Sequence, residues 1–384
     1  MKRFFRLFTA TLTALAAFAP VLNAEEVEKC ASCAPPVKKE LVLSFTGDMM
    51  AHIINYSMDD YSLIYRDIEK IMMNDSLTFC NVEFPVNPEI PQASYPVFNI
   101  HPEYVMAAID AGVDVLSLAN NHTGDQGTQG LKSTVKAVNS MVNRYRLEHN
   151  RRIYFSGAKQ NPEIDFKPVT IYQNGWKIGY LSVSQFSNTV PEPGHMLLVD
   201  FRDTEESEQF VEWISTIVSE YDLFVLAYHG GREYYTTPVQ KKTELFHNLS
   251  SAGVDIIWGH HPHVIQPVEL YEHKNGNSLI MYSLGNFISG QGRIADPVLP
   301  EEEWSYTGDS AIIQADISFD GENPVFEDIR AIPIANIMTT NRDVVITPLE
   351  DLTHQAVPEP WMTYFLERYI LMHDYFIRNI RLPG

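Results

Sequence analysis

The sequence predicts an α/β protein with layered sheets and helices, and three observations predict it. Strand-like and helix-like segments alternate from residue 40 to residue 287, which is the pattern of α/β domains. Two of the strand-like segments, 113–118 and 254–258, are mostly apolar, as is typical of buried strands. These two segments end abruptly in Asn120-Asn121-His122 and in Gly259-His260-His261-Pro262-His263. Loops at the ends of such strands are where α/β proteins place their chemistry.

The individual elements follow from apolar runs, caps and turn residues along the chain. Strands are predicted at 41–46, 76–82, 113–119, 153–155, 167–173, 176–183, 223–228, 254–258, 278–282, 311–318 and 325–333. Helices are predicted at 61–73, 102–112, 128–149, 205–220, 238–253 and 361–380. Asn174-Gly175 separates two of the strands and favours a tight hairpin. Residues 290–310 are rich in Gly, Pro and Glu and are expected to form a long loop.

The N-terminus has the features of a secretory signal peptide over residues 1–24. Lys2, Arg3 and Arg6 precede an apolar stretch, and Ala24 is the small residue that a cleavage site needs. Export to the periplasm or the cell surface, with cleavage near Ala24, is therefore expected. An uncleaved membrane anchor is the alternative.

The expected domain organisation is simple. A flexible tail over 25–39 is followed by one domain over 40–350. The stretch 351–384 contains an aromatic helix, which is expected to pack on that domain, and contact with a partner or a membrane surface is the alternative. Cys30 and Cys33 lie in the tail, where they are compatible with a local disulfide or with metal binding, whereas Cys80 is expected to be a small buried residue.

The charge of the chain limits its partners. The formal net charge is −21, and loss of the three basic residues of the signal peptide makes it −24. This excess of negative charge argues against nucleic acid and against anionic membrane surfaces as partners. An anionic substrate would need a metal to supply local positive charge.

Carboxylate, amide and imidazole side chains recur at the predicted strand ends. They are Asp48, His52, Asn81, Glu83, Asn120, Asn121, His122, His229, Glu233, His260, His261, His263 and Asn286. A two-metal site uses this mixture, because a carboxylate can bridge two cations while imidazoles and amides complete the coordination. In an extended segment, His261 and His263 would point the same way. Single members of the set have ordinary alternatives: Asp48 and Glu83 could be caps, and His52 could lie on a helix face.

Two other kinds of site are disfavoured by the sequence. A serine hydrolase would carry a Gly-x-Ser-x-Gly elbow, whereas Ser283 lies in Tyr-Ser-Leu-Gly-Asn. Nucleotide cofactors would need a Gly-x-Gly-x-x-Gly or Walker-type loop, and the chain has neither.

Six motifs together resemble the CapA family of poly-γ-glutamate capsule biosynthesis proteins. They are Gly47-Asp48, Asn81-Val82-Glu83, Ala119-Asn120-Asn121-His122 with Asp125-x-Gly127, His229-Gly230-x-x-Glu233-Tyr234, Gly259-His260-His261-Pro262-His263-Val264-x-Gln266, and Tyr282-Ser283-Leu284-Gly285-Asn286-Phe287. They occur in the family's order and cover residues 41–290. The resemblance implies a calcineurin-like metallophosphatase-type fold, in which helices flank a two-sheet β-sandwich with metals at the strand ends.

The resemblance also implies roles for single residues. The implied ligands of two divalent transition metals (Mn, Fe or Zn) are Asp48, Glu83, Asn121, His229, His261 and His263. His122, Glu233 and Asn120 would be catalytic or would support the ligands, and His122 is placed like the general acid of the phosphatase relatives. We also expect Arg232 and Asn286 to contact substrate. The chain departs from the family in having Gly230 where a Trp is usual, and from the phosphatase relatives in having Glu83 where Asp is common.

The function expected from these features is an exported, metal-dependent protein that acts on poly-γ-glutamate or a related peptide-like cell-surface polymer. Hydrolysis of an amide by metal-activated water is the expected chemistry. A di-metal phosphoesterase is an alternative, although only Arg232 and Arg293 are near enough in sequence to hold a phosphate. The second alternative is a non-catalytic accessory of a membrane polymer synthase that docks through the aromatic C-terminal helix.

Overall fold

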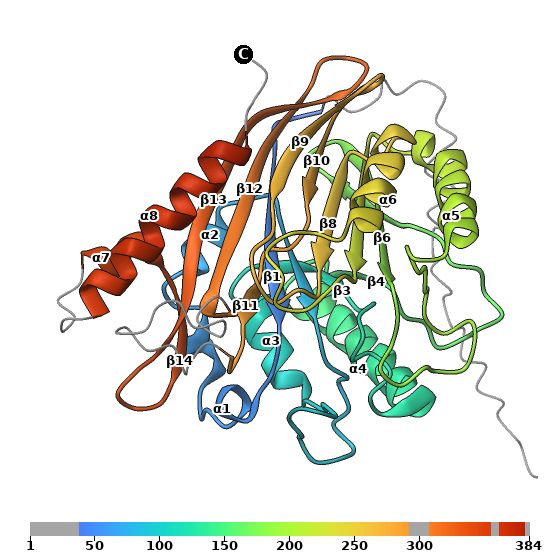
Figure 1. The fold of residues 1–384 in the computed structure, drawn as a ribbon. Coiled ribbons are helices and arrows are strands. Elements are labelled where there is room, and N and C mark those ends of the chain that lie inside the picture. Colours follow the sequence, from blue (N-terminus) through green and yellow to red (C-terminus); the bar gives the residue numbers. More distant parts are fainter. Residues whose placement is uncertain (1–37, 292–306, 355–360, 381–384) are drawn as a thin grey trace, which may run out of the picture. The chain divides into compact units, whose positions relative to one another are not determined.

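The computed structural model of the protein describes residues 38–291, 307–354 and 361–380, and these residues form two β-sheets flanked by helices (Figure 1). The larger sheet has the spatial order β14 (Val344–Pro348), β13 (Pro324–Met338), β12 (Asp309–Phe319), β1 (Leu41–Met49), β2 (Leu77–Val82), β3 (Val113–Ser117) and β4 (Tyr154–Ser156), with β11 (Asn286–Ile288) paired to β1. The smaller sheet has the order β5 (Val169–Gln173), β6 (Trp176–Ser184), β7 (Leu223–His229), β8 (Ile256–His260), β10 (Gly276–Met281) and β9 (Val268–His273).

Both sheets have a parallel centre and antiparallel edges. Strands β1 to β4 run parallel, and β12, β13 and β14 join them antiparallel. In the smaller sheet β6, β7, β8 and β10 are parallel, while β5 and β9 pair antiparallel at the edges. Parallel strands carry their carboxyl ends to the same edge of a sheet, so the loops that follow them converge.

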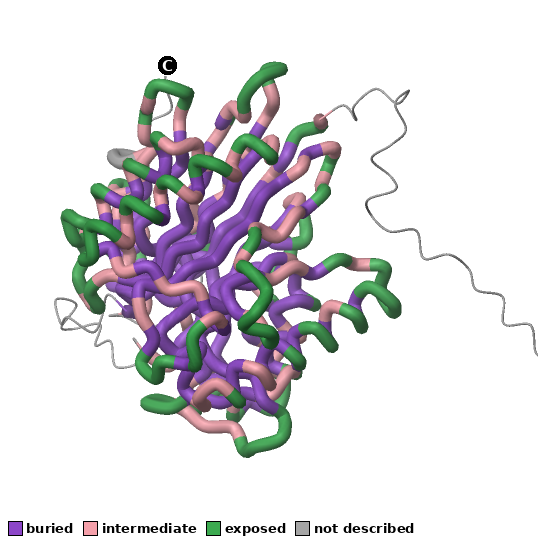
Figure 2. Tube along the Cα trace, turned by 90° about the vertical axis from the view of Figure 1, so that its right-hand side faces the viewer, coloured by how far each residue is buried: buried purple, intermediate pink, exposed green. Residues whose placement is uncertain are grey.

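The helices cover the outer faces of the two sheets. They are α1 (Ile53–Tyr56), α2 (Glu69–Met73), α3 (Pro102–Asp110), α4 (Gly127–Glu148), α5 (Thr204–Ile217), α6 (Gln240–Ser251), α7 (Leu349–Thr353) and α8 (Trp361–Asn379), with 3₁₀ helices at Tyr61–Ile64 and Val218–Glu220. Side chains of α3 and α4 pack in one apolar cluster on the larger sheet, and side chains of α5 and α6 pack in another on the smaller sheet. Figure 2 shows the result, with buried strands running through the centre of a largely exposed outer layer.

The core between the sheets is aromatic. The rings of Phe45 and Phe79, from the larger sheet, lie 4.7 Å apart, and each lies 5.9 Å from the ring of Trp258 in the smaller sheet. Trp258 also donates a hydrogen bond from Nε1 to the backbone oxygen of Thr46, at 2.8 Å. This bond joins β8 to β1 close to the strand ends, so the two sheets are aligned where the candidate ligands emerge.

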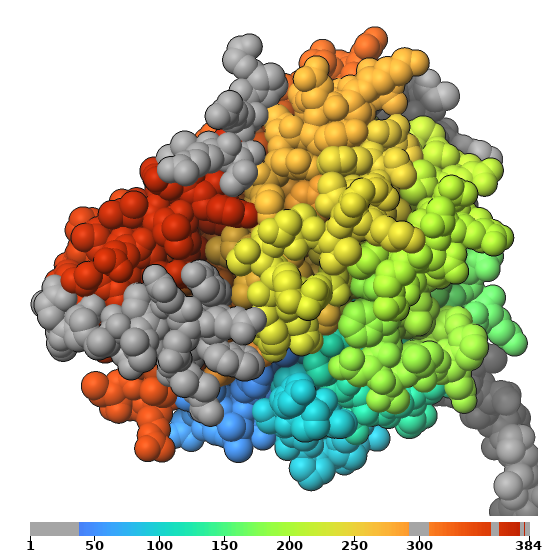
Figure 3. Space-filling view, in the orientation of Figure 1, coloured from blue at the N-terminus to red at the C-terminus, as the bar shows by residue number. Residues whose placement is uncertain are grey.

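Helix α8 contacts a strand of each sheet, β13 and β9. Its buried side chains Tyr364, Phe365, Met372 and Phe376 belong to the core cluster between the sheets. In the space-filling view of Figure 3, α8 (red) lies beside the orange-yellow surface that includes β9. No helix among the described residues is both long enough and apolar enough to cross a membrane.

The predicted fold class, a two-sheet α/β sandwich flanked by helices, is confirmed by this arrangement. The hairpin at Asn174-Gly175 is also found, with φ values of 51° and 87° that suit a type I′ turn. The predicted helix 61–73 is wrong in detail, because the chain forms a 3₁₀ turn over Tyr61–Ile64 and only a short α2. Strands β9, β11 and β14 and the short helices α1 and α7 were not predicted. The signal peptide, Cys30, Cys33 and Arg293 lie outside the described residues.

Candidate metal centre

The implied ligands come from both sheets and meet at the carboxyl ends of the parallel strands. Asp48 lies in β1, Glu83 follows β2 and Asn121 follows β3, all from the larger sheet. His229 ends β7, and His261 and His263 follow β8 in the smaller sheet. All six side chains are buried. The structure therefore brings together all six residues of the expected ligand set.

Glu83 lies at the centre of this set. Its Oε1 atom is 3.6 Å from Nε2 of His229 and 3.6 Å from Nε2 of His263. The carboxylate of Glu83 belongs to two groups of possible ligands. Asp48 and His263 complete one group, and His229 and His261 complete the other; within each group the ligand atoms lie within 4.8 Å of one another. A carboxylate between two ligand groups has the position of a bridge between two cations.

The polar atoms of the cluster fit a metal ion. Oε1 of Glu83 and Nδ1 of His261 are buried and have no hydrogen-bond partner. Buried polar atoms of this kind normally find a partner, because leaving them unpaired is costly. A divalent cation bound by carboxylate, imidazole and amide groups would satisfy them, so the donor set suits Mn, Fe or Zn.

The protonation of the cluster also suits metal binding. Burial lowers the pKa of His261 to about 3 and lowers the pKa of His229 well below its usual value, so both imidazoles are neutral and free to act as ligands. Burial, together with the nearby Asp48, raises the pKa of Glu83 well above its usual value. A cation at this place would favour the ionised carboxylate and remove the reason for that rise.

The backbone that carries the two histidines is not extended, contrary to the prediction. His261 has φ of 96° and His263 has φ of 57°, both in the left-handed region that non-glycine residues rarely adopt. Two hydrogen bonds hold this turn: His261 N donates to Oδ2 of Asp48 at 3.2 Å, and Tyr234 N donates to the oxygen of Pro262 at 2.8 Å. The turn brings the rings of His261 and His263 to 5.8 Å from each other. Strained backbone conformations of this kind cluster at functional sites.

Close backbone approach explains two glycines next to the ligands. A Cβ atom on Gly47 would lie 2.1 Å from the oxygen of Gly285, and one on Gly259 would lie 2.3 Å from the oxygen of Tyr282. Any larger residue would push apart strand ends that deliver Asp48 and His260.

The side-chain amides of Asn286 and Asn120 are both hydrogen-bonded within the protein. Asn286 Oδ1 lies 3.0 Å from Nδ1 of His263, and its Nδ2 donates to Gln291 Oε1 and to the oxygen of Thr307. Both ends of the amide are therefore hydrogen-bonded, an arrangement that orients His263. Asn120 is equally enclosed, because its Oδ1 accepts from His122 N and its Nδ2 donates to the oxygen of Val82. It shapes the loop that carries Asn121 and His122.

His122 has the partner that a proton-transfer residue needs. Its Nδ1 lies 2.7 Å from Oδ2 of Asp125, and the ring packs edge-on against Phe98, with the ring centroids 4.8 Å apart. A carboxylate at Nδ1 fixes the tautomer and the ring orientation, which leaves Nε2 as the nitrogen available for chemistry.

Glu233 and Arg232 lie at the exposed rim of the centre. Glu233 offers a carboxylate oxygen within 4.8 Å of ligand atoms of His261 and His263. The guanidinium of Arg232 stacks on the ring of Tyr235, at 3.6 Å from its centroid. Among the described side chains, none forms an ion pair with Arg232, so its hydrogen-bond donors remain available to an anion.

The structure adds two residues that the sequence did not point to, Phe186 and Lys242, and it shows the surroundings of His260. Phe186 is half-buried and packs edge-on against the His261 ring, with centroids 5.2 Å apart. His260 is buried beside Asp48, with Nδ1 at 3.1 Å from Oδ1 but without the geometry of a hydrogen bond. Lys242 is buried on α6 next to the loop after His229. Phe186 and Lys242 lie in stretches without any metal-ligand pattern, and His260 is one histidine among three.

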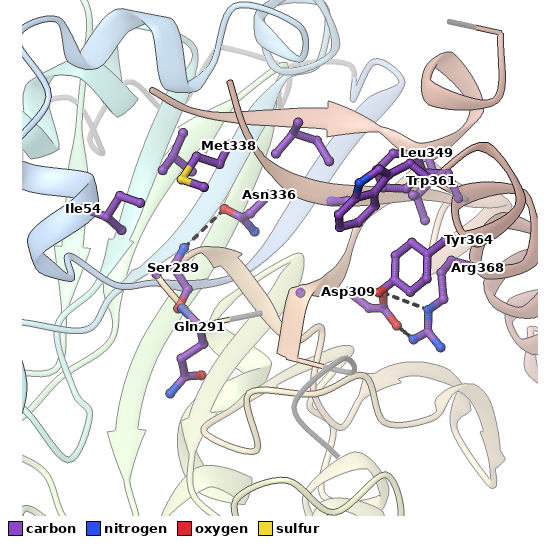
Figure 4. A pocket seen from close by; sticks show the side chains of 16 residues that line it. Ile54, Ser289, Gln291, Asp309, Asn336, Met338, Leu349, Trp361, Tyr364 and Arg368 are labelled. Carbon is purple, nitrogen blue, oxygen red and sulfur yellow. Dashed lines mark hydrogen bonds and ion pairs between the residues drawn. The ribbon is translucent and has the colours of Figure 1, made fainter. Parts of the chain in front are cut away.

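A cavity of about 280 Å³ lies beside the centre, between β13, β14 and α8 (Figure 4). Trp361, Tyr364 and Leu349 line one side, and Ile54 and Met338 lie opposite. It is separate from the ligand cluster, and Gln291, which accepts the hydrogen bond from Asn286, connects the two.

Comparisons with known proteins agree with the motifs. The model of the family "Bacterial capsule synthesis protein PGA_cap" matches residues 42–291. The capsule biosynthesis protein CapA of Bacillus anthracis is 30% identical over 323 residues, which cover 77% of this chain and 69% of that protein. The PGA biosynthesis protein CapA of Bacillus subtilis is 31% identical over 294 residues, 73% of this chain and 69% of that protein. Among solved structures, the calcineurin-like phosphoesterase YfkN of B. subtilis aligns with a TM-score of 0.43 and 12% identity, over 78% of this chain and 91% of that one.

Proposed function

Because the chain belongs to the bacterial capsule synthesis protein family PGA_cap, we propose that it acts in the biosynthesis or processing of poly-γ-glutamate or a related peptide-like cell-surface polymer. The proposed activity is hydrolysis of an amide bond by an exported enzyme that holds two divalent metal ions. Export is proposed from the N-terminal sequence alone.

The observation that carries the activity is the position of Glu83 between two groups of possible ligands. Asp48 and His263 would complete one metal position. Asn121, His229 and His261 would complete the other, since Oδ1 of Asn121 lies 2.8 Å from Nε2 of His229. Metals bound there would lower the pKa of a water molecule and stabilise the negative charge that develops on the amide oxygen.

The protein's own residues would supply proton transfer and substrate orientation. Glu233 has an exposed carboxylate beside His261 and His263, where it can accept the proton of the attacking water. His122, held at Nδ1 by Asp125, can deliver a proton from Nε2 to the leaving amine. Arg232 can hold a carboxylate of the polymer at the rim, because no described acidic side chain occupies it.

The test combines metal analysis with substrate assays. Purified protein is analysed by elemental mass spectrometry beside the double variant His261→Ala/His263→Ala, with circular dichroism to show that the variant folds. We expect about two transition metals per wild-type chain, loss of metal in the variant, and release of amine from poly-γ-glutamate by the wild type only.

The same assay decides against the alternatives. Turnover of phosphate esters without any amide hydrolysis would replace the proposed activity with phosphoester hydrolysis. A protein that binds no metal after reconstitution would not be a metal-dependent enzyme. In that case an accessory role, which needs no turnover, would be the better explanation of its family membership.

A further inference from the structure

Lys242 is a buried basic residue whose hydrogen-bond partners among the described residues are both neutral. It lies on α6 (Gln240–Ser251) and has no exposed surface. Its Nζ donates to the backbone oxygen of Gly230 at 2.8 Å and to that of Tyr282 at 2.9 Å. Arg368, the other buried basic side chain in the part of the chain that the structure describes, is paired with Asp309. Burial of an ammonium group without a carboxylate is unfavourable, so its place in the structure calls for an explanation.

The two carbonyl groups belong to segments that deliver candidate ligands. Gly230 directly follows His229 at the end of β7. Tyr282 follows β10 and begins the turn that leads to Asn286, the residue that orients His263. The oxygen of Tyr282 also lies over Gly259 in β8, where a Cβ atom would come within 2.3 Å of it. One side chain of α6 therefore reaches the point where the ends of β7, β8 and β10 meet.

We propose that Lys242 is a positioning residue of the metal centre, which sets the distance between the backbone that carries His229 and the backbone that leads to Asn286, the residue that orients His263. The inference rests on the proposed metal centre. The amino group of Lys242 carries several N–H groups, so it can donate to two backbone carbonyls from different segments at once.

The proposal does not depend on the charge of Lys242. Burial lowers the pKa of its ammonium group to about 7. The neutral amine still has two N–H groups, enough for both hydrogen bonds. The charge and the hydrogen bonds also predict opposite effects on metal affinity: removing a nearby positive charge would tighten cation binding, whereas losing the tie would loosen the ligand geometry and weaken it.

Binding of Co²⁺ to the metal-free full chain tests the proposal, with affinity and the visible absorption spectrum as readouts. Lys242→Met removes the donors and keeps most of the side-chain volume. Lys242→Gln keeps donors on a shorter arm. Lys241→Met is the matched control, because Lys241 is the exposed neighbour on the same helix and donates only to the backbone oxygen of Arg202, at 2.8 Å.

We expect Lys242→Met to bind Co²⁺ roughly 10- to 100-fold more weakly, as loss of support behind metal ligands typically does, with a changed spectrum. Lys242→Gln should be intermediate, and Lys241→Met should match the wild type. Wild-type affinity and spectrum in a folded Lys242→Met protein, or tighter binding, would overturn the positioning role and leave the metal centre standing. If Lys242→Met does not fold, Lys242→Gln decides by the same criteria. A wild-type protein that binds no Co²⁺ would instead refute the metal centre, and the positioning role with it.

Discussion

Oδ1 of Asn121 lies 2.8 Å from Nε2 of His229, although the two residues belong to different sheets. Asn121 follows β3 of the larger sheet, and His229 ends β7 of the smaller one. In the tautomer protonated at Nε2, His229 donates a hydrogen bond to this oxygen, and a cation bound here would take the place of that proton and be held by both atoms. The contact therefore marks the place where one of the two proposed metals would join the sheets.

Asn121→Ala should remove one of the two metals, and Glu83→Ala should remove both. Asn121 belongs to one proposed position only, whereas Glu83 belongs to both ligand groups. Elemental mass spectrometry of the purified variants, with circular dichroism as the check on folding, measures the outcome. Equal metal content in the two variants would contradict the bridging role of Glu83.

Asp125→Asn should slow polymer hydrolysis roughly 100-fold or more without loss of metal. The carboxylate of Asp125 holds Nδ1 of His122 at 2.7 Å, and general acid–base catalysis contributes on the order of 100- to 10,000-fold. Rates of amine release and metal content are measured on the same preparation. A variant that loses metal together with activity would show that Asp125 supports the ligands and not proton transfer.

Arg232→Ala should weaken binding of poly-γ-glutamate and leave metal content unchanged. The chain has a net charge of −21, so it repels a polyanion except near local positive charge. The contact of the polymer with Arg232 is electrostatic and should weaken as the salt concentration rises. Arg146→Ala, an exposed arginine of α4, is the control. Polymer affinity equal to that of the wild type would exclude Arg232 from the binding surface.

Asp255→Asn should flatten the pH dependence of stability between about pH 4 and about pH 7. Asp255 precedes β8, and burial raises the pKa of its carboxyl group to about 7. The unfolded chain releases this proton near pH 4, so the folded state binds it more tightly and stability falls as pH rises from about 4 to about 7.

The size of this effect is on the order of 3 kcal/mol for a fully buried carboxyl group. Urea unfolding at several pH values measures it, with the exposed Asp59→Asn as control. Parallel pH profiles for Asp255→Asn and the wild type would contradict the assignment. Burial also raises the pKa of Asp75 to about 7. Part of the pH dependence of stability therefore remains in both the wild type and Asp255→Asn.

Gly47→Ala should destabilise the protein by roughly 3 kcal/mol, because the new methyl group would overlap a backbone oxygen that cannot move freely. A Cβ atom there lies 2.1 Å from the oxygen of Gly285. Gly321→Ala is a useful comparison: it meets nothing within 4 Å and is strained only by φ of 112°, so about 1 kcal/mol is expected. Thermal unfolding measures both, and equal losses would show that the close approach at Gly47 is relieved.

The sequence was informative where chemistry follows a regular strand. Asp48, Glu83 and His229 each come at the end of an apolar run, and parallel strands bring such ends together whatever the details of the loops. The family resemblance alone predicted that two sheets contribute the candidate ligands, because the periodicity of the sequence does not say which strands pair.

The remaining features depend on tertiary contacts that leave no local pattern. Lys242 follows Lys241 in an ordinary amphipathic helix, and nothing in the spacing shows that only one of the two is buried. The hydrogen bonds of Asn286 to His263, Gln291 and Thr307 likewise follow from no spacing in the sequence. The left-handed turn at His261 was missed because non-glycine residues rarely adopt it.

The bond between Trp258 and Thr46 has a mechanical consequence. It joins one sheet to the other close to the strand ends, and the hydroxyl groups of Ser117 in β3 and Ser182 in β6, 2.7 Å apart, join them at a second place. Much of the remaining contact is between apolar side chains, which tolerate small sliding motions. A shear of one residue along the strands, about 3.3 Å, would leave every ladder within each sheet intact yet separate Asn121 from His229. The hydrogen bond from the indole of Trp258 therefore opposes sliding of one sheet along the other, so the loss of a side chain that binds no metal itself would disturb the centre.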